Sequence, residues 1–270
     1  MTGLATDDTL KAVTLLSVNV NKLATLRNAR GKNSPNVEQV SQDILNYGAH
    51  GLTVHPRPDG RHIRPRDVHV LSDLIKDYRD SQRKVEFNVE GYPSTEFLQL
   101  MSVVQPDQCT LVPDPPDVLT SNAGWPLAAQ RKLLEPICAQ LKDQGIRVSL
   151  FVDPYNLTDL DLKALETIGP HRLELYTEAY AEAFDSGEFE GTLKVFREAA
   201  DRLLALGFEL NAGHDLNVDN LTPLLKHIPE IKEVSIGHAL ICEALKLGMS
   251  TAVKNYLDLL AQVAQTPENS

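Results

Sequence analysis

Residues 126–152 read PLAAQRKLLEPICAQLKDQGIRVSLFV, an amphipathic stretch followed almost at once by a short apolar run. The amphipathic part, Pro126–Gln144, predicts a helix, and Gly145 directly after it is a residue on which helices commonly end. The run Arg147–Val152 predicts a β-strand that is buried on both faces. A helix that returns to a buried strand is the repeating unit of a parallel α/β fold.

Short apolar runs of this kind recur along the whole chain. The other predicted strands are Thr14–Val20, Gly51–Val54, Val85–Val89, Gln108–Val112, Arg172–Leu175, Phe208–Asn211 and Glu233–Ile236. Strand starts roughly 25–40 residues apart match a (β/α)8 barrel, the TIM-barrel fold, which uses about 250 residues as one domain. We therefore expect residues 1–270 to form a single TIM-barrel domain with extra helices. The competing fold, an open doubly wound sheet, usually carries a glycine-rich phosphate loop after its first strand, and neither GxGxxG nor GxxxxGKS/T occurs.

Amphipathic stretches between the strands predict helices. They are Val37–Tyr47, Arg66–Tyr78 after Pro65, a helix opened by Ser94, Thr158–Ile168 with Thr158 as N-cap, Thr192–Leu206, Val218–His227 and a long final stretch from about Leu247 to Gln265. The connection Thr177–Gly191 is longer than a minimal one, so we expect an extra helix at Glu178–Phe184. Residues 1–12 and 266–270 are expected to be flexible ends.

Charge and composition exclude several classes of protein. The net charge of −11 argues against a nucleic-acid binder. No apolar run approaches the ~18 residues of a membrane span, and the N-terminus lacks the apolar core of a signal peptide. The three cysteines, Cys109, Cys138 and Cys242, fit neither a disulfide framework nor a metal motif. We therefore expect a cytoplasmic protein, and the cysteines predict no metal site.

The basic residues are unevenly distributed. Residues 21–66 contain eight lysines and arginines against three acidic residues, although the chain as a whole is acidic. A local arginine cluster in an acidic protein indicates a small anionic ligand.

In a TIM barrel the functional residues lie at the carboxyl ends of the strands. The residues that the sequence places there or inside a strand are Asn19, His55, Arg57, Glu86, Glu174, His214, Gly237 and His238. His50, His69, His171 and His227 are interpreted as non-functional.

Glu86 and Glu174 each stand inside a strand that is otherwise suited to burial. A buried carboxyl group needs a partner, or else its pKa rises, and a raised pKa suits a general acid or base. The alternative for both residues is a structural ion pair inside the barrel.

Two segments are suited to phosphate. The loop from His55 to His62 presents Arg57, Arg61 and His62 between prolines and a glycine, and the alternative is a solvated basic loop. At the other end of the chain, Gly237 and His238 open an apolar helical run whose first N–H groups would be free to bind an anion. Barrel enzymes often bind phosphate after their seventh and eighth strands.

Several of these runs together resemble the pyridoxine 5′-phosphate synthase family. They are Val18-Asn19-Val20 with Ala24 to Gly31 (ATLRNARG), Thr53 to Arg57 (TVHPR), the strand with Glu86, Leu111-Val112-Pro113, Val148 to Phe151, Asn211 to His214 (NAGH) and Ile236 to Ala239 (IGHA). The resemblance runs in order from about Leu16 to Leu260.

The resemblance implies a TIM barrel that assembles as a homo-octamer. It also implies condensation of 1-deoxy-D-xylulose 5-phosphate with 3-amino-2-oxopropyl phosphate to give pyridoxine 5′-phosphate, phosphate and water. By the family pattern, His55 and Glu86 are general bases, His214 is a proton donor and Glu174 stabilises the transition state. Asn19, Gly237 and His238 hold the aminoketone phosphate, whereas Arg30, Arg57, His62 and Thr120 hold the deoxyxylulose phosphate.

The chain departs from the family pattern at Asn21 and Lys22, where an Asp-His pair is usual, and at Asp215, where glycine is usual. All three positions belong to the substrate site by the family pattern, and an ion pair between Lys22 and Asp215 would offset the added carboxylate. Two alternatives stay open: a family relative with a different phosphorylated carbonyl substrate, or a non-catalytic protein that binds phosphorylated ligands.

Overall fold

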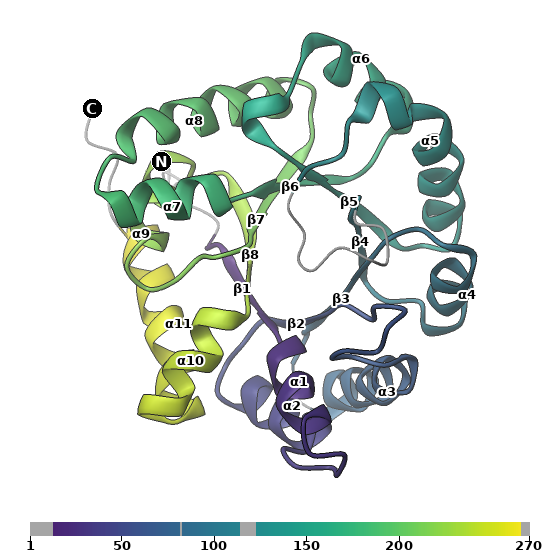
Figure 1. Ribbon diagram of the computed structural model, residues 1–270, viewed down its shortest axis with the longest axis vertical. Helices are drawn as coiled ribbons and strands as arrows, with labels where there is room; N and C mark the ends of the chain where they lie inside the picture. Colours follow the sequence, from purple (N-terminus) through teal and green to yellow (C-terminus); the bar gives the residue numbers. More distant parts are fainter. Residues whose placement is uncertain (1–12, 82, 114–122, 266–270) are drawn as a thin grey trace, which may run out of the picture.

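The protein is a closed barrel of eight parallel strands surrounded by helices, as seen down the barrel axis in a computed structural model (Figure 1). The structure describes residues 13–81, 83–113 and 123–265. Each strand pairs with the next one in sequence, and β8 closes the ring against β1. The strands are β1 (Leu15–Asn19), β2 (Gly51–Val54), β3 (Glu86–Gly91), β4 (Gln108–Leu111), β5 (Arg147–Val152), β6 (Arg172–Tyr176), β7 (Glu209–Gly213) and β8 (Ile231–Ile236). The predicted TIM barrel and its eight strands are confirmed.

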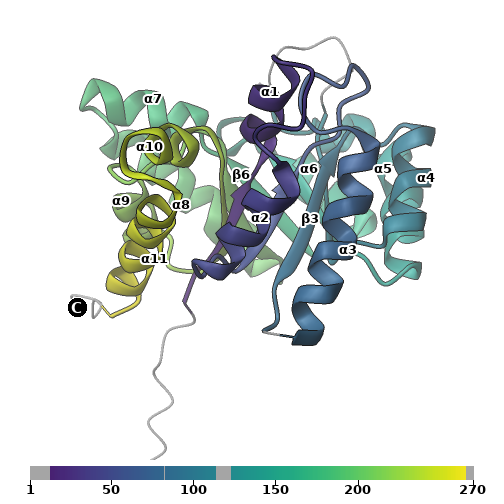
Figure 2. The ribbon, with the colours of Figure 1, turned by 90° about the horizontal axis from the view of Figure 1, so that it is seen from below.

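The helices form the outer layer of the molecule and leave the two ends of the barrel to loops (Figure 2). They are α1 (Asn21–Asn28), α2 (Val37–Asn46), α3 (Pro65–Ser81), α4 (Thr95–Val104), α5 (Leu127–Asp143), α6 (Asp159–Ile168), α7 (Glu178–Ser186), α8 (Glu190–Ala205), α9 (Leu221–His227), α10 (His238–Leu247) and α11 (Met249–Gln265), with a short 3-10 turn η1 (Pro154–Asn156).

Most predicted helices lie where the sequence placed them. Ser94 and Thr158 cap α4 and α6 by accepting hydrogen bonds from backbone N–H groups of the first turn. The extra helix after β6 is α7. The helical run after Gly237 is α10, and the predicted final stretch is α11. One difference stands out: residues 21–28 form a helix, α1, that was not predicted.

The strands alternate polar and apolar side chains, unlike the uniformly apolar strands expected from the sequence. Polar side chains point into the lumen, because they bond across it to strands that are not neighbours. Gln108 of β4 donates to Glu233 of β8 (3.5 Å), and Thr110 of β4 donates to Glu174 of β6 (3.4 Å). The barrel interior is therefore a network of buried hydrogen bonds.

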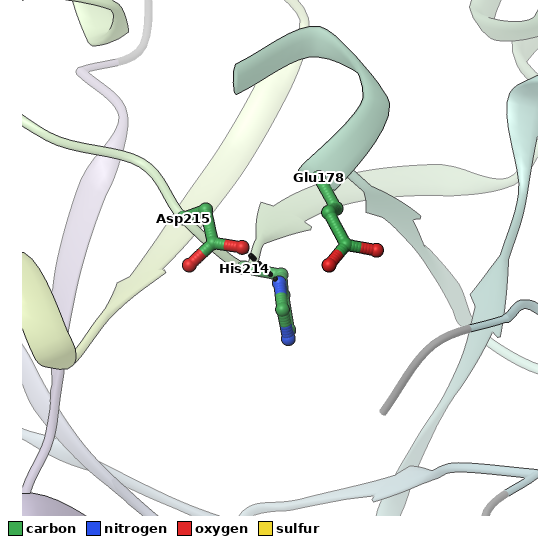
Figure 3. Close-up of side chains that lie close together, drawn as sticks. All are labelled: Glu178, His214 and Asp215. Carbon is green, nitrogen blue, oxygen red and sulfur yellow. Dashed lines mark ion pairs between the residues drawn. The ribbon is translucent and has the colours of Figure 1, made fainter. Parts of the chain in front are cut away.

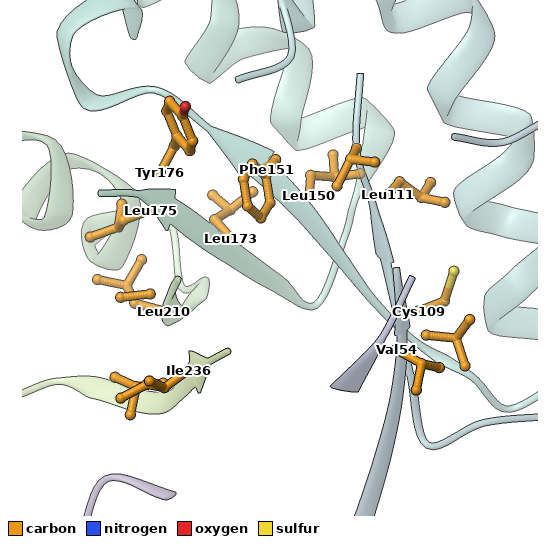
Figure 4. Close-up of a cluster of buried hydrophobic side chains, with 14 of the residues drawn as sticks. Val54, Cys109, Leu111, Leu150, Phe151, Leu173, Leu175, Tyr176, Leu210 and Ile236 are labelled. Carbon is orange, nitrogen blue, oxygen red and sulfur yellow. The ribbon is translucent and has the colours of Figure 1, made fainter. Parts of the chain in front are cut away.

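The apolar side chains of the strands face outward and pack under the helices. Figure 4 shows part of this layer, with Val54, Cys109, Leu111, Leu150, Leu173 and Leu210 among the labelled residues. This shell buries the apolar surface of the fold and supplies most of its stability. It leaves the strand ends available for polar groups.

Two further expectations concern the cysteines and the membrane. Cys109, Cys138 and Cys242 are free thiols, and the first two are buried. Among the described residues, no helix is long and apolar enough to cross a membrane.

Candidate active site

Three strand ends bring polar side chains together at the carboxyl rim of the barrel. Glu90, near the end of β3, lies with its Oε2 3.9 Å from Nδ1 of His55, the residue directly after β2. Asn19, the last residue of β1, donates from Nδ2 to the same carboxylate oxygen (3.5 Å). An imidazole, a carboxylate and an amide thus meet at one place.

Asn21 ties the first two strand ends to each other. Its side-chain oxygen accepts the backbone N–H of His55 (2.9 Å), and its own backbone N–H donates to Oδ1 of Asn19 (3.1 Å). Asn21 therefore holds the backbone beside His55 and the side chain of Asn19.

His55 is kept neutral by its surroundings. Burial is the largest influence, and together with the charges of His62 and Arg57 it lowers the pKa of His55 to about 3. The rings of His55 and His62 lie 6.0 Å apart, and burial together with Arg57 lowers the pKa of His62 to about 4. A neutral imidazole has a lone pair that can accept a proton.

Glu174 of β6 lies deeper in the barrel and is almost completely buried. Burial raises the pKa of its carboxyl group well above the usual range, and the nearby carboxyl groups of Glu90 and Glu233 raise it further. The raised pKa favours the protonated form of Glu174, which can donate a hydrogen bond. Gly213 at the end of β7 makes room for it, since a Cβ at position 213 would lie 2.3 Å from Oε1 of Glu174.

Glu86 does not belong to this group, and its expected place at the rim was wrong. It is the first residue of β3, so its side chain lies at the opposite, amino end of the barrel. There it pairs with Arg147 of β5. Burial raises the pKa of Glu86, but the hydrogen bond and charge of Arg147 outweigh it and the net pKa is lowered. The structural ion pair, the alternative weighed for Glu86, is what the structure contains.

The residue that sequence reasoning missed is Glu90. The predicted strand ended at Val89, whereas β3 continues two residues further to Gly91, so Glu90 fell outside the predicted strand. Positions 86, 88 and 90 face the same side of a strand because side chains alternate with a period of two. That period would have indicated Glu90 as a second lumen-facing carboxyl group, closer to the rim than Glu86.

His214 and Asp215 follow β7 and are drawn with Glu178 in Figure 3. Nδ1 of His214 lies 2.8 Å from Oδ2 of Asp215, and the Tyr176 ring contacts the His214 ring edge-on at 4.8 Å between centroids. The possible ligand atoms of Glu178, His214 and Asp215 lie within 4.8 Å of one another. Among the described residues these three side chains could hold a divalent cation.

The basic loop after β2 is built around the neighbouring segment of α1. Asn28 donates to the carbonyl groups of Gly60 (3.2 Å), Arg61 (3.2 Å) and His62 (2.8 Å), which holds this loop against α1. Arg27 is buried and forms a two-pronged ion pair with Asp67 of α3. Two residues of the ATLRNARG run are therefore structural.

Arg57 and Arg30 differ in their exposure. Arg57 is buried beside His55 and His62, whereas Arg30 is exposed in the turn after α1. A cavity of about 560 Å³ opens next to His55 and Arg57, and Tyr92 and Phe97 form part of its opposite wall. This volume is within the range of small-molecule sites.

Gly237 and His238 lie where β8 passes into α10, the helix that begins at His238. A Cβ at position 237 would lie 3.1 Å from Cβ of Asn19, so the glycine allows the ends of β8 and β1 to approach. The first N–H groups of α10 and the amide of Asn19 therefore meet at the rim, as an anion site requires.

Two of the histidines interpreted as non-functional have structural contacts. Nδ1 of His50 accepts the backbone N–H of Leu16, and Nδ1 of His171 accepts that of Val148, each at 3.0 Å. Thr120, predicted to bind phosphate, lies outside the described residues.

Comparison with known proteins now identifies the family. The family model described as "Pyridoxal phosphate biosynthesis protein PdxJ" matches residues 16–262. The chain belongs to this family. A relative from Cytophaga hutchinsonii, named pyridoxine 5′-phosphate synthase, is 46% identical over 91% of this chain and 98% of its own. A relative of the same name from Bacteroides thetaiotaomicron is 48% identical over 92% of this chain and 100% of its own.

Solved structures of other proteins share the barrel fold of this chain. The tryptophan synthase alpha chain from Legionella pneumophila has a TM-score of 0.61 at 13% identity, covering 96% of this chain and 94% of its own. A likeness at this low identity shows only the shared fold.

The ion pair expected between Lys22 and Asp215 is replaced by a contact between Asp215 and His214. His214 is the close partner of the Asp215 carboxylate, and its contact is the largest of the influences that lower the pKa of Asp215. Lys22 is exposed and contributes a weaker, longer-range charge. The carboxylate that replaces the usual glycine is therefore stabilised by the neighbouring imidazole.

Proposed function

We propose that this PdxJ protein is a pyridoxine 5′-phosphate synthase. It condenses 1-deoxy-D-xylulose 5-phosphate with 3-amino-2-oxopropyl phosphate and releases phosphate and water. The observation that carries the proposal is the meeting of His55, Glu90 and Asn19 near the buried Glu174, whose pKa is raised. The family and the names of the relatives support it.

The reaction needs several proton transfers within one pocket. An amine adds to a ketone and water leaves, then phosphate is eliminated and the ring closes with further loss of water. Neutral His55 and the carboxylate of Glu90 are suited to accept protons from the substrates. We assign to Glu90 the role expected of Glu86, because Glu90 is at the rim and Glu86 is paired with Arg147.

Protons must also be returned to the departing oxygens. The raised pKa of Glu174 favours its protonated form, which is suited to stabilise negative charge that develops on a substrate oxygen. We propose that His214 donates the proton that a leaving hydroxyl group needs. The chain's own acid and base groups suffice for these steps, so we propose no metal or other cofactor.

Two phosphorylated substrates require two anion sites. We propose that Asn19, Gly237, His238 and the start of α10 hold the aminoketone phosphate. Arg57, His62 and the exposed Arg30 would hold the deoxyxylulose phosphate, as would Thr120. Asn21 and Lys22 lie in the sequence between Asn19, assigned to the first phosphate, and Arg30, assigned to the second. We propose that both residues, together with Asp215, lie at the edge of the substrate site.

The test is product formation by the purified protein. Incubation with both substrates should give the absorbance of pyridoxine phosphate and release phosphate in equal amounts. Each substrate alone should give neither signal. Tight binding of one substrate without product would overturn the proposal and favour a non-catalytic protein that binds phosphorylated ligands.

The hypothesis that the protein acts on a different phosphorylated carbonyl substrate has less support. It rested on Asn21, Lys22 and Asp215, but relatives 45–48% identical to this chain across about nine-tenths of it are named as the synthase. Replacing deoxyxylulose phosphate by other ketose phosphates should abolish turnover. Faster turnover with one of them would favour the hypothesis of a different substrate.

The assembly and compartment are also proposals. We propose a homo-octamer in the cytoplasm. Leu245 and Leu247, 76% and 51% exposed on α10, support an interface, and the free thiols support a reducing compartment. Light scattering coupled to size-exclusion chromatography measures the mass of the assembly, and cell fractionation locates the protein.

A further inference from the structure

Three side chains at the rim are arranged like the ligands of a cation. They are Glu178, the first residue of α7, and His214 and Asp215, which follow β7. The possible ligand atoms of all three lie within 4.8 Å of one another. Figure 3 shows the two carboxylates on either side of the His214 ring. Neither carboxylate takes part in the proton transfers proposed above, so the cluster is open to a second role.

Nδ1 of His214 is the atom that points to a ligand. It is buried, and it has no hydrogen-bond partner among the described residues. An oxygen of Asp215, Oδ2, lies 2.8 Å away. That distance would suit a hydrogen bond, so the contact fails on direction, and Oδ2 lies to the side of the axis on which the ring nitrogen donates or accepts. A buried polar atom normally has a partner on that axis.

A metal ion on the lone-pair axis of Nδ1 would account for this geometry. The ion would lie about 2.1 Å from the nitrogen and about as far from a carboxylate oxygen beside it. Two such ligand atoms are about 3.0 Å apart when the angle between them at the ion is 90°. The separation of Nδ1 and Oδ2, 2.8 Å, is close to this value. One ion could therefore bind both atoms with little movement of either side chain.

Glu178 can supply the third ligand atom. The hydroxyl group of Tyr176 donates to one of its carboxylate oxygens, which orients the group and leaves the other oxygen for an ion. Two carboxylates make the site negatively charged. The positive groups that act on Asp215 from farther away are His238 and the exposed Lys22.

We propose that Glu178, His214 and Asp215 form a binding site for one divalent transition-metal ion of the Zn²⁺ type. One imidazole nitrogen and two carboxylate oxygens suit Zn²⁺ better than Mg²⁺, which prefers oxygen alone and keeps its water molecules. The proposed reaction does not need this ion. An ion on His214 would occupy the proposed proton donor, so Zn²⁺ should inhibit turnover. The inhibition rests on the proposed function, whereas binding of the ion can be measured without substrate.

The test compares Glu178→Gln with Glu182→Gln. Glutamine at position 178 keeps an oxygen that accepts from Tyr176 but loses the charge. Glu182 is exposed one turn further along α7, so the same change there is the matched control. Isothermal titration calorimetry with Zn²⁺ measures the number of ions per chain and their affinity. The protein carries no histidine tag and is first freed of metal with EDTA.

The wild-type protein and Glu182→Gln should bind one Zn²⁺ per chain even in excess Mg²⁺. Glu178→Gln should bind it at least about 10-fold more weakly. Asp215→Asn should show a similar loss, and asparagine tolerates the left-handed backbone at this position, where φ is 57°. Equal affinity in all four proteins would overturn the inference, because the ion would then bind elsewhere. Absence of binding to the wild-type protein, or displacement of Zn²⁺ by Mg²⁺, would overturn it too.

A thiol and an imidazole on α10 are an alternative pair of ligands. Sγ of Cys242 lies 3.6 Å from Nε2 of His238. Cys242→Ser should leave the affinity for Zn²⁺ unchanged. A loss in Cys242→Ser as large as that expected in Glu178→Gln would contradict the inference, because the ion would then bind at the thiol.

Turnover gives a second readout. Zn²⁺ should inhibit product formation by the wild-type protein, EDTA should restore it, and Glu178→Gln should need at least about 10-fold more Zn²⁺ for the same inhibition. Equally strong inhibition of Glu178→Gln would show that the inhibition does not come from this site. If the wild-type protein makes no product without Zn²⁺, the proposed function fails, while calorimetry still decides whether the three residues bind the ion.

Discussion

The two ends of β3 carry two glutamates with opposite environments. At the amino end, Glu86 is paired with Arg147, and the net pKa of Glu86 is lowered. At the carboxyl end, Glu90 lies beside His55 and Asn19, and its carboxyl group raises the pKa of buried Glu174. A carboxylate stabilised by arginine holds the barrel together, whereas one placed among imidazoles and other carboxyl groups is available for proton transfer.

The largest expected difference between the two ends is in turnover. Glu90→Gln should lower kcat by about 1,000-fold, because general base catalysis contributes about 100- to 10,000-fold. Glu86→Gln should leave kcat within about threefold. Steady-state kinetics of the two variants measure this directly, and a Glu86→Gln enzyme as inactive as Glu90→Gln would break the comparison.

The next difference is in how acid destabilises each end. The pKa of His55 is lowered to about 3 in the folded protein from 6.5, so the unfolded chain takes up a proton that the fold excludes. The free energy of unfolding therefore falls as the pH drops below 6.5, by about 3 kcal/mol by pH ~4.5. The pKa of Glu86 is instead lowered from 4.5, so its contribution is present above 4.5 and is lost only at more acid pH.

Urea unfolding between about pH 7 and 3 measures both pH ranges. His55→Asn should flatten the loss of stability that begins at the higher pH, and Glu86→Gln should leave that part of the curve unchanged. An equally steep loss in His55→Asn would show that another group, such as His62, accounts for it.

The smallest effect is on stability at neutral pH. Glu86→Gln removes the charge that Arg147 faces, in a pair that is partly accessible to water. We expect a loss of about 1–2 kcal/mol in the free energy of unfolding. Glu135→Gln in the exposed pair with Arg131 is the matched control, and it should cost less than about 0.5 kcal/mol.

The sequence predicted the barrel, its eight strands and most of its helices, because buried runs separated by amphipathic stretches recur at regular spacing. It was less successful with Glu86 and Glu90. The predicted strand ended two residues before the end of β3 and so left out Glu90, the carboxyl group that reaches the rim, and strand ends carry little signal. The arginine that pairs with Glu86 is 61 residues away in sequence, so only the folded barrel brings the two together.

The helix α1 illustrates a second limit. Residues 21–28 were interpreted through their motif, and the motif did not show that Arg27 and Asn28 hold the neighbouring loop. The prediction of uniformly apolar strands was also wrong. The polar residues in the strands have partners on distant strands, and the sequence alone does not show which residues those partners are.

That polar lumen has a consequence for how the protein can be divided. Gln108 and Thr110 of β4 bond to Asn211, Glu233 and Glu174 in the second half of the barrel. A fragment ending after β4 would leave these groups without the partners that the closed ring supplies, and a buried polar group without a partner costs about 1–3 kcal/mol. Closure of the ring therefore contributes to the stability of each half, and we expect the barrel to unfold as a single cooperative unit rather than as two separate halves.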